Sequence, residues 1–197
     1  MIGEGVADWA GRSLILDRAG GQSGRNFASI IFRGDLLMKA IDLLKKDHDT
    51  VKKMFAAFEK MGSHAQKDRL AQAEEICEEL RIHAAIEEEI FYPAVKSVRD
   101  KEAKFDVEEA LEEHKQMKSA MEDALKDEGQ EPAFAAKMKV LKENVEHHAG
   151  EEEKEIFKVA RKLGDDRLEE LGQQLQERKE ALQAEDTGNH RQGTTKA

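Results

Sequence analysis

The sequence has little of what several classes of protein need. It contains one cysteine, two prolines, one tryptophan, one tyrosine and eight phenylalanines. The single cysteine, Cys77, excludes an internal disulfide framework and a zinc site built from several cysteines, and it suits a reducing, cytoplasmic location. No run of about 18 apolar residues exists, so no membrane-spanning helix is expected. Scarce prolines and aromatics, together with abundant Glu, Lys, Ala, Leu and Met, predict an all-α fold.

The charge of the chain is dense and negative. Its 197 residues carry 32 Lys+Arg against 42 Asp+Glu, which gives a formal net charge of −10. This balance provides no broad basic surface for phosphates, so neither a nucleic acid nor a membrane is expected as a partner. The length fits one domain with additional segments at its ends. No motif identifies a protein partner.

The two ends differ in composition from the rest. Residues 1–34 hold seven of the fourteen glycines and the only tryptophan. We therefore expect residues 1–35 to form a poorly ordered leader, and a second reading is that translation begins at Met38. Residues 184–197 lack apolar periodicity and are expected to form a disordered tail.

Between the ends, apolar residues recur with the period of an α-helix. Helix-stopping residues near Gly62, at or shortly after Pro93, and near Gly129 and Gly164 divide this region. Four long helices with short connections predict an up-down-up-down bundle over residues 36–163, followed by a short fifth helix within 164–183. The expected helical ranges are 36–60, 66–92, 104–127, 132–164 and 166–182.

The inward stripe of each long helix is apolar except at one level. A histidine interrupts each stripe, and in the second and fourth helices a glutamate follows four residues later. Counting from the expected helix ends at about 1.5 Å per residue places these side chains at nearly one height. The residues concerned are His48, His83, Glu87, His114, His148 and Glu152.

An internal repeat relates the two halves of the bundle. Asp47-His48 corresponds to Glu113-His114 at an offset of 66 residues, and the pair His83 and Glu87 corresponds to His148 and Glu152 at an offset of 65. Each half is thus a helical hairpin that contributes two histidines and one glutamate. Two facing hairpins predict a site with pseudo-twofold symmetry.

Such a polar cluster inside an apolar core needs a compensating charge. Buried carboxylates and imidazoles are costly unless they are paired, and two divalent cations would pair them. Imidazole nitrogen and carboxylate oxygen suit iron, and also manganese or zinc. Glu87 and Glu152 each have two oxygens with which to bridge two ions, and four histidines supply two ligands per ion. The unfilled coordination positions are where dioxygen, peroxide or nitric oxide would bind.

The segments 41–48, 83–93, 113–114 and 147–157, taken together, resemble the hemerythrin-like, or HHE cation-binding, domains. The resemblance covers about residues 37–163 and implies a four-helix bundle with a non-haem di-iron centre whose ligands occupy the six positions above. Oxygen-carrying hemerythrins have a further histidine where this chain has Lys118. That departure argues against reversible oxygen carriage and leaves sensing, peroxide handling, nitric oxide binding and iron storage open.

Two ligand positions have neighbours that compete for the role. His147 precedes His148 but lies about 100° away around the helix, off the apolar stripe, so His148 is the predicted ligand. Glu153 would replace Glu152 if the helix bulged near Gly150. The other glutamates of the runs 87–89 and 151–153 are expected on solvated faces.

Three kinds of function follow from these residues. The first is a cytoplasmic di-iron protein that binds a small ligand or handles iron. The second is an enzyme that acts on peroxide at the same centre. The third is a structural bundle without metal, since a single histidine with an acidic residue four positions later also arises as an ordinary surface pair.

Overall fold

The structure is a computed structural model that describes residues 5–9, 12–16 and 38–193. It divides into two compact units, residues 1–36 and residues 37–197. In the first unit, β1 (Gly5–Trp9) pairs in antiparallel fashion with β2 (Arg12–Leu16), with Val6 opposite Ile15. These strands were not predicted from the sequence. The remainder of the expected leader, and residue 37 before Met38, lie outside the described residues.

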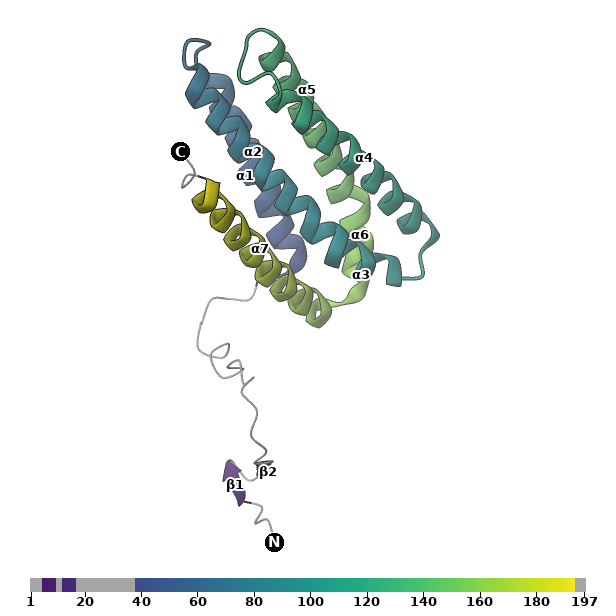
Figure 1. Ribbon diagram of the computed structural model, residues 1–197. Helices are drawn as coiled ribbons and strands as arrows, with labels where there is room; N and C mark the ends of the chain where they lie inside the picture. The colour runs from purple at the N-terminus through teal and green to yellow at the C-terminus, as the bar shows by residue number, and fades with distance from the viewer. Residues whose placement is uncertain (1–4, 10–11, 17–37, 194–197) are drawn as a thin grey trace. The chain divides into compact units, whose positions relative to one another are not determined.

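The second unit is the expected four-helix bundle (Figure 1). Its long helices are α1 (Ala40–Lys60), α2 (Gln66–Ile86), α4 (Lys101–Leu125) and α5 (Ala133–Glu151). Asp100 caps α4, because its carboxylate accepts hydrogen bonds from the amides of Glu102 and Ala103. The amphipathic pattern thus predicts the four helices and their order. The expected starts at 36 and 104 are wrong, since α1 begins at Ala40 and α4 at Lys101, where Asp100 caps it.

Two helices change their winding partway along. A π-helical turn, η2 (Glu87–Phe91), follows α2 and leads into α3 (Tyr92–Ser97). A second π-helical turn, η3 (Glu152–Ile156), follows α5 and leads into α6 (Phe157–Ala160) and a short 3₁₀ turn, η4 (Arg161–Leu163). Pro93 lies in the first turn of α3, where a proline needs no amide hydrogen, so the helix continues past it.

The apolar core consists of two clusters of buried side chains. One lies toward the end formed by α3 and α6 and includes Leu44, Ile86, Phe91 and Phe157. The other lies toward the opposite end and includes Val51, Leu80, Met117, Met121 and Val145. In α1, α2 and α4, and in α5 together with η3, the predicted histidine falls between members of the two clusters. The polar residues therefore form a layer with apolar packing above and below it.

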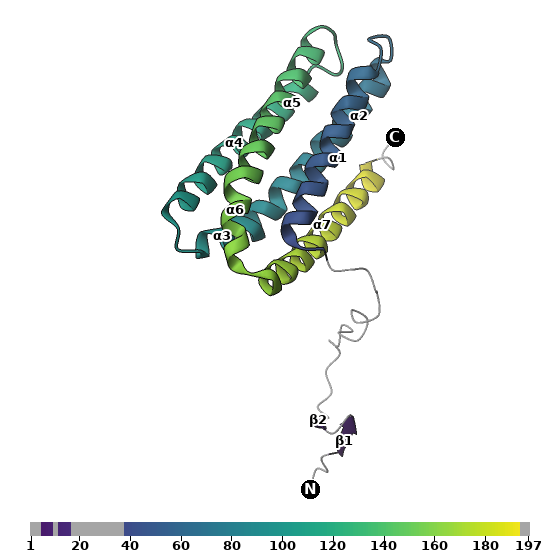
Figure 2. The same cartoon turned by 180° about the vertical axis from the view of Figure 1, so that it is seen from behind.

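The fifth helix, α7 (Asp165–Gly193), packs outside the bundle beside α1 and α2 (Figure 2). Leu168, Leu171 and Leu175 are buried apolar side chains of this helix, and Leu182 packs partly against the same cluster. The expected end of this helix at 183 is wrong, because helical structure continues through 184–193. Asp186, Thr187, Gly188 and Asn189 in this stretch are weak helix formers, so neither propensity nor apolar period predicts the extension. Residues 194–197 lie outside the described residues.

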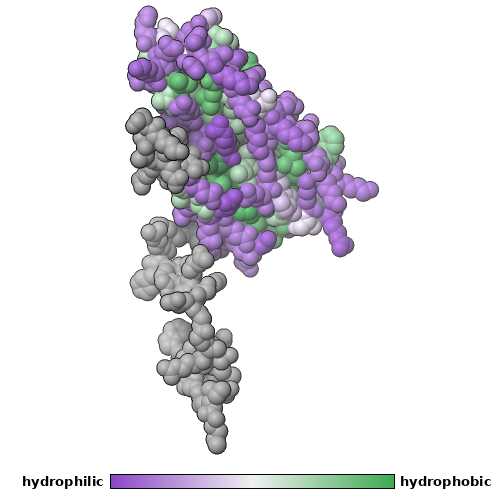
Figure 3. Space-filling view, in the orientation of Figure 1, coloured by the Kyte–Doolittle hydropathy of each residue, from purple (hydrophilic) through white to green (hydrophobic). Residues whose placement is uncertain are grey.

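The face of the molecule in Figure 3 is mainly hydrophilic, with smaller apolar areas between the helices. Within the part of the chain that the structure describes, no helix combines the length and hydropathy needed to cross a membrane.

Gly172 sets how closely α7 approaches the start of α1. A Cβ atom there would overlap the carbonyl oxygen of Met38 and lie 2.9 Å from the amide nitrogen of Ala40. We expect Gly172→Ala to lower the free energy of unfolding by about 1–3 kcal/mol, measured by urea denaturation, because backbone must move. Gly150→Ala is the control: no atom lies within 4 Å of its Cβ position, and alanine there gains about 0.5–1 kcal/mol of helix propensity. Equal stability changes in the two variants would contradict the close packing of α7.

Candidate metal centre

Six side chains from all four long helices meet in the polar layer. They form two groups that share Glu87, and within each group the candidate ligand atoms lie within 4.8 Å of one another. They are the six residues predicted from the sequence: His48 of α1, His83 of α2, Glu87 at the start of η2, His114 of α4, His148 of α5 and Glu152 at the start of η3.

The histidines face one another in two pairs. The Nε2 atoms of His48 and His83 are 3.1 Å apart, and those of His114 and His148 are also 3.1 Å apart. Glu87 lies between the pairs, with one oxygen 3.1 Å from His83 Nε2 and the other 3.4 Å from His114 Nε2. A carboxylate placed in this way can serve an ion on either side of it.

An outer carboxylate faces the Nδ1 atom of each histidine. Three pairs are at hydrogen-bond distance and the fourth is longer. The nitrogen–oxygen distances are 3.0 Å for His48 and Glu153, 3.6 Å for His83 and Asp47, 2.8 Å for His114 and Glu88, and 2.7 Å for His148 and Glu113. The internal repeat relates these pairs. Asp47 and Glu113 precede the first histidine of their hairpins, and each faces the second histidine of the same hairpin. Glu88 and Glu153 follow the inner glutamates, and each faces a histidine of the other hairpin.

For His48, His114 and His148, the outer carboxylate determines which ring nitrogen carries the hydrogen. A carboxylate only accepts hydrogen bonds, so Nδ1 is the donor and the neutral ring presents a lone pair at Nε2. Two lone pairs at 3.1 Å repel each other unless a cation lies beside them. Nitrogens bound to one ion at about 2.1 Å, at nearly a right angle, would be about 3 Å apart. The observed separations therefore fit a shared cation.

The inner carboxylates also lack partners of their own. Glu87 and Glu152 are 0% and 2% exposed, and none of their four oxygens accepts a hydrogen bond within the described structure. An ionised carboxylate in this state is strongly destabilising. Divalent cations would satisfy these oxygens, so the donor set fits a metal site.

Without an ion, protons would carry the compensating charge. Burial alone would lower the pKa of His83, but the charge of Glu87 and the contact with Asp47 outweigh it and raise the pKa to about 10. Burial also opposes protonation of His114, but its contacts with the carboxylates of Glu87 and Glu88 raise its pKa to about 9. Burial and the charge of Glu87 raise the pKa of Glu152, whereas the imidazoles hold the pKa of Glu87 well below its usual range despite burial.

The structure distinguishes between the two neighbouring candidates at each of the two uncertain ligand positions. The side chain of His147 is 64% exposed and lies beside Glu113 and Glu151 at the surface, whereas that of His148 is 4% exposed. Although the helix does bulge, at η3, Glu152 remains the inner residue. Glu153 holds His48 from outside instead.

The outer carboxylates were missed in the sequence, where Glu88 and Glu153 were expected on solvated faces. The available signal was the repeat, since Asp47 matches Glu113 and Glu88 matches Glu153. Three of these carboxylates are themselves held by lysines. The pairs are Asp47 with Lys179 of α7 at 2.7 Å, Glu88 with Lys118 at 2.7 Å, and Glu153 with Lys45 at 3.2 Å.

A small pocket opens on the side of the centre away from the glutamates. All four histidines line it, together with apolar side chains such as Leu80, Met117 and Val145. It holds about 20 Å³ of space for the centre of a water molecule, which is room for about one molecule of that size. The pocket therefore admits only a very small ligand.

Comparisons with known proteins match the part of the chain that forms the bundle. The family described as the hemerythrin HHE cation-binding domain matches residues 39–160. A crystal structure of a hemerythrin HHE cation-binding domain-containing protein from Mycobacterium kansasii is similar over 81% of this chain and 94% of that one, with 27% sequence identity and a TM-score of 0.68. No curated protein sequence matches the chain.

We expect His148→Ala to lower the metal content of purified, metal-loaded protein, because His148 supplies one inward Nε2 atom. His147→Ala should leave the content unchanged, since that imidazole lies at the surface. Elemental analysis after desalting measures the ratio of metal to chain. Equal losses in both variants would show that His148 is not a ligand.

The pKa values of His83 and His114 predict how the metal-free protein responds to pH. Because their pKa values are raised on folding, their contribution to stability is complete below pH 6.5 and is lost as pH rises through about 9 to 10. The free energy of unfolding of metal-free protein, from urea titrations, should therefore fall over this range. Metal loading at pH 8 should release protons, detectable with an indicator dye. Uptake without proton release would contradict the protonation of these two residues.

Proposed function

Because the chain belongs to the hemerythrin HHE cation-binding family, we propose that its centre holds two iron ions and binds one small molecule, such as dioxygen, nitric oxide or peroxide. The ligands in this proposal are His48, His83, Glu87, His114, His148 and Glu152. The observation that carries it is the set of four buried, unpartnered carboxylate oxygens facing four imidazole Nε2 atoms.

The donor atoms support the choice of metal. Four imidazole nitrogens and two carboxylates, without sulfur, suit iron and also accept manganese or zinc. Cys77 is buried within an apolar cluster and belongs to neither candidate group in the centre. Iron, when bound, would supply redox chemistry toward small molecules, which zinc cannot.

The pocket supports a small and uncharged or weakly charged ligand. Its apolar walls would exclude large polar molecules, and its size limits the ligand to a few atoms. Lys118 borders the pocket, but its ammonium group binds both oxygens of Glu88 at 2.7 and 2.9 Å. This lysine therefore neutralises the carboxylate that orients His114. It does not replace the additional histidine of the oxygen carriers, which favours sensing, peroxide handling or iron handling over oxygen transport.

Tyr92 favours peroxide breakdown as a second candidate function. Its side chain is buried, and its hydroxyl oxygen lies 3.5 Å from His114 Nε2. Burial and the charges of Glu87 and Glu152 raise the pKa of Tyr92 well above its usual value, so the hydroxyl keeps its proton. Tyr92 belongs to the cluster across the polar layer from the pocket, so this hydroxyl would be a hydrogen-bond donor on the opposite side of the centre.

Loading the protein with iron(II) without oxygen tests the proposal. We expect about two iron ions per chain and an absorption spectrum that changes when oxygen, azide or nitric oxide is added, while the larger tert-butyl isocyanide has no effect. Glu87→Ala should abolish uptake, and the loop variant His64→Ala should not. An iron content near zero, or a spectrum indifferent to all three small ligands, would refute the proposal. Oxygen release from hydrogen peroxide, measured with an electrode, distinguishes the enzyme from the binding protein.

A further inference from the structure

A depression in the surface between α4 and η3 leads inward to the metal centre. Its wall carries five carboxylates, and His148 and Glu152 lie at its inner end. One basic residue, Lys154, also borders it and contacts Glu155 at 2.6 Å. The five wall residues are Asp106, Glu109, Glu113, Glu151 and Glu155, and we call them the acidic wall.

The matching face of the other hairpin has the opposite character. Applying the repeat offsets, Asp106 and Glu109 correspond to Ala40 and Leu43, and Glu151 and Glu155 correspond to Ile86 and Ile90. The first-half residues are apolar and mostly buried, and they belong to or pack against the cluster that includes Leu171 and Leu175 of α7. The α7 helix therefore closes one of two equivalent faces, and the other face remains open and acidic.

Glu152 provides an independent sign that this face receives a cation. Its side chain is 0% exposed, both its oxygens lack a hydrogen-bond partner, and it lines the depression. Partial burial and the charges of Glu155 and Glu102 raise the pKa of Asp106. The depression is therefore a region of negative potential that ends on an unsatisfied buried carboxylate.

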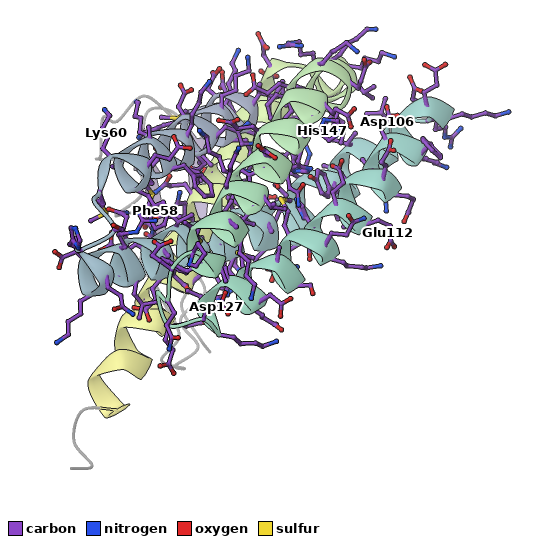
Figure 4. The ribbon with its side chains drawn as sticks, turned by 90° about the horizontal axis from the view of Figure 1, so that it is seen from above. Phe58, Lys60, Asp106, Glu112, Asp127 and His147 are labelled. Atoms are coloured by element: carbon purple, nitrogen blue, oxygen red, sulfur yellow. The ribbon has the colours of Figure 1, made fainter. Side chains whose placement is uncertain are left out.

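A third group of candidate metal ligands lies at the rim of the depression. Candidate ligand atoms of Glu113, His147 and Glu151 are within 4.8 Å of one another. Glu113 also accepts a hydrogen bond from His148 Nδ1 at 2.7 Å, so it belongs to both the rim and the centre. Figure 4 labels Asp106 and His147, which lie on neighbouring helices along the same side of the bundle.

Other approaches to the centre suit a cation less well. The small pocket above the histidines has apolar walls, and a charged ion would lose its hydration there without compensation. A hollow beside His48 is lined by two lysines and three carboxylates, so it is less strongly negative than the acidic wall, which is bordered by one lysine. Negative walls with low-dielectric surroundings concentrate cations and speed their association.

We propose that the acidic wall between α4 and η3 is the entry route by which a divalent cation, iron(II) in the proposed function, reaches Glu152 and His148. The proposal rests on the proposed metal centre, and it assigns to the wall a role in the rate of loading, separate from the final affinity. Carboxylates of the wall would replace water ligands of the hydrated ion, which would then pass inward to Glu152.

The test measures the rate of metal uptake. Cobalt(II) is mixed rapidly with metal-free protein, and its visible absorption reports binding by nitrogen and oxygen ligands. We expect Asp106→Asn/Glu109→Gln/Glu155→Gln to load about tenfold more slowly than the unmodified chain at low salt, with the same final metal content. The difference should shrink in about 0.5 M salt, where charges more than a few ångströms apart are screened.

A matched control comes from an exposed acidic group on α2. Glu74→Gln/Glu75→Gln/Glu78→Gln removes the same charge, and Glu78 pairs with Arg81 as Glu155 pairs with Lys154. This control should load within about twofold of the unmodified rate, because these residues do not line the depression. Equal rates in the two triple variants, with normal final content, would overturn the entry route alone. Failure of the unmodified chain to bind cobalt or iron at all would instead refute the metal centre.

Discussion

Two buried carboxylates among four imidazoles are the constraint around which this bundle is arranged. Glu87 and Glu152 lie between two apolar clusters, where an unpaired charge has a high desolvation cost. The positive charge that offsets this cost comes from protons on the imidazoles or from metal ions in their place. Folding and metal binding are therefore coupled, because the same side chains set the energy of both.

The outer carboxylates make this layer rigid. Three of them form hydrogen bonds with an imidazole, the fourth lies 3.6 Å from His83 Nδ1, and lysines neutralise three of the four. One of these lysines, Lys179, belongs to α7, so a helix outside the bundle reaches the contact that orients His83. The π-helical turns begin at the two inner glutamates, and the next residue in each turn, Glu88 or Glu153, faces a histidine from the other hairpin. Each π-helical turn thus places one glutamate inside the centre and the next glutamate against a histidine from outside.

The two hairpins are equivalent in their inner residues but differ in their surroundings. The α7 helix covers the face formed by α1 and η2, while the corresponding face of α4 and η3 carries acidic side chains. Opposite the glutamates, a narrow apolar pocket touches all four histidines. The nearly symmetric centre therefore lies between an acidic face on one side and an apolar pocket on another.

The sequence alone determined the helices and the six inner residues, because helical period and the repeat are local patterns in which a buried polar position stands out against apolar neighbours. It also placed His148 ahead of His147, since position around a helix follows from residue number. Tertiary structure decided the rest. Glu88 and Glu153 resemble solvated glutamates in sequence, and only the crossing of the two hairpins brings them to His114 and His48. The position of α7 on one of two equivalent faces depends on packing between residues more than a hundred positions apart, which no local period records.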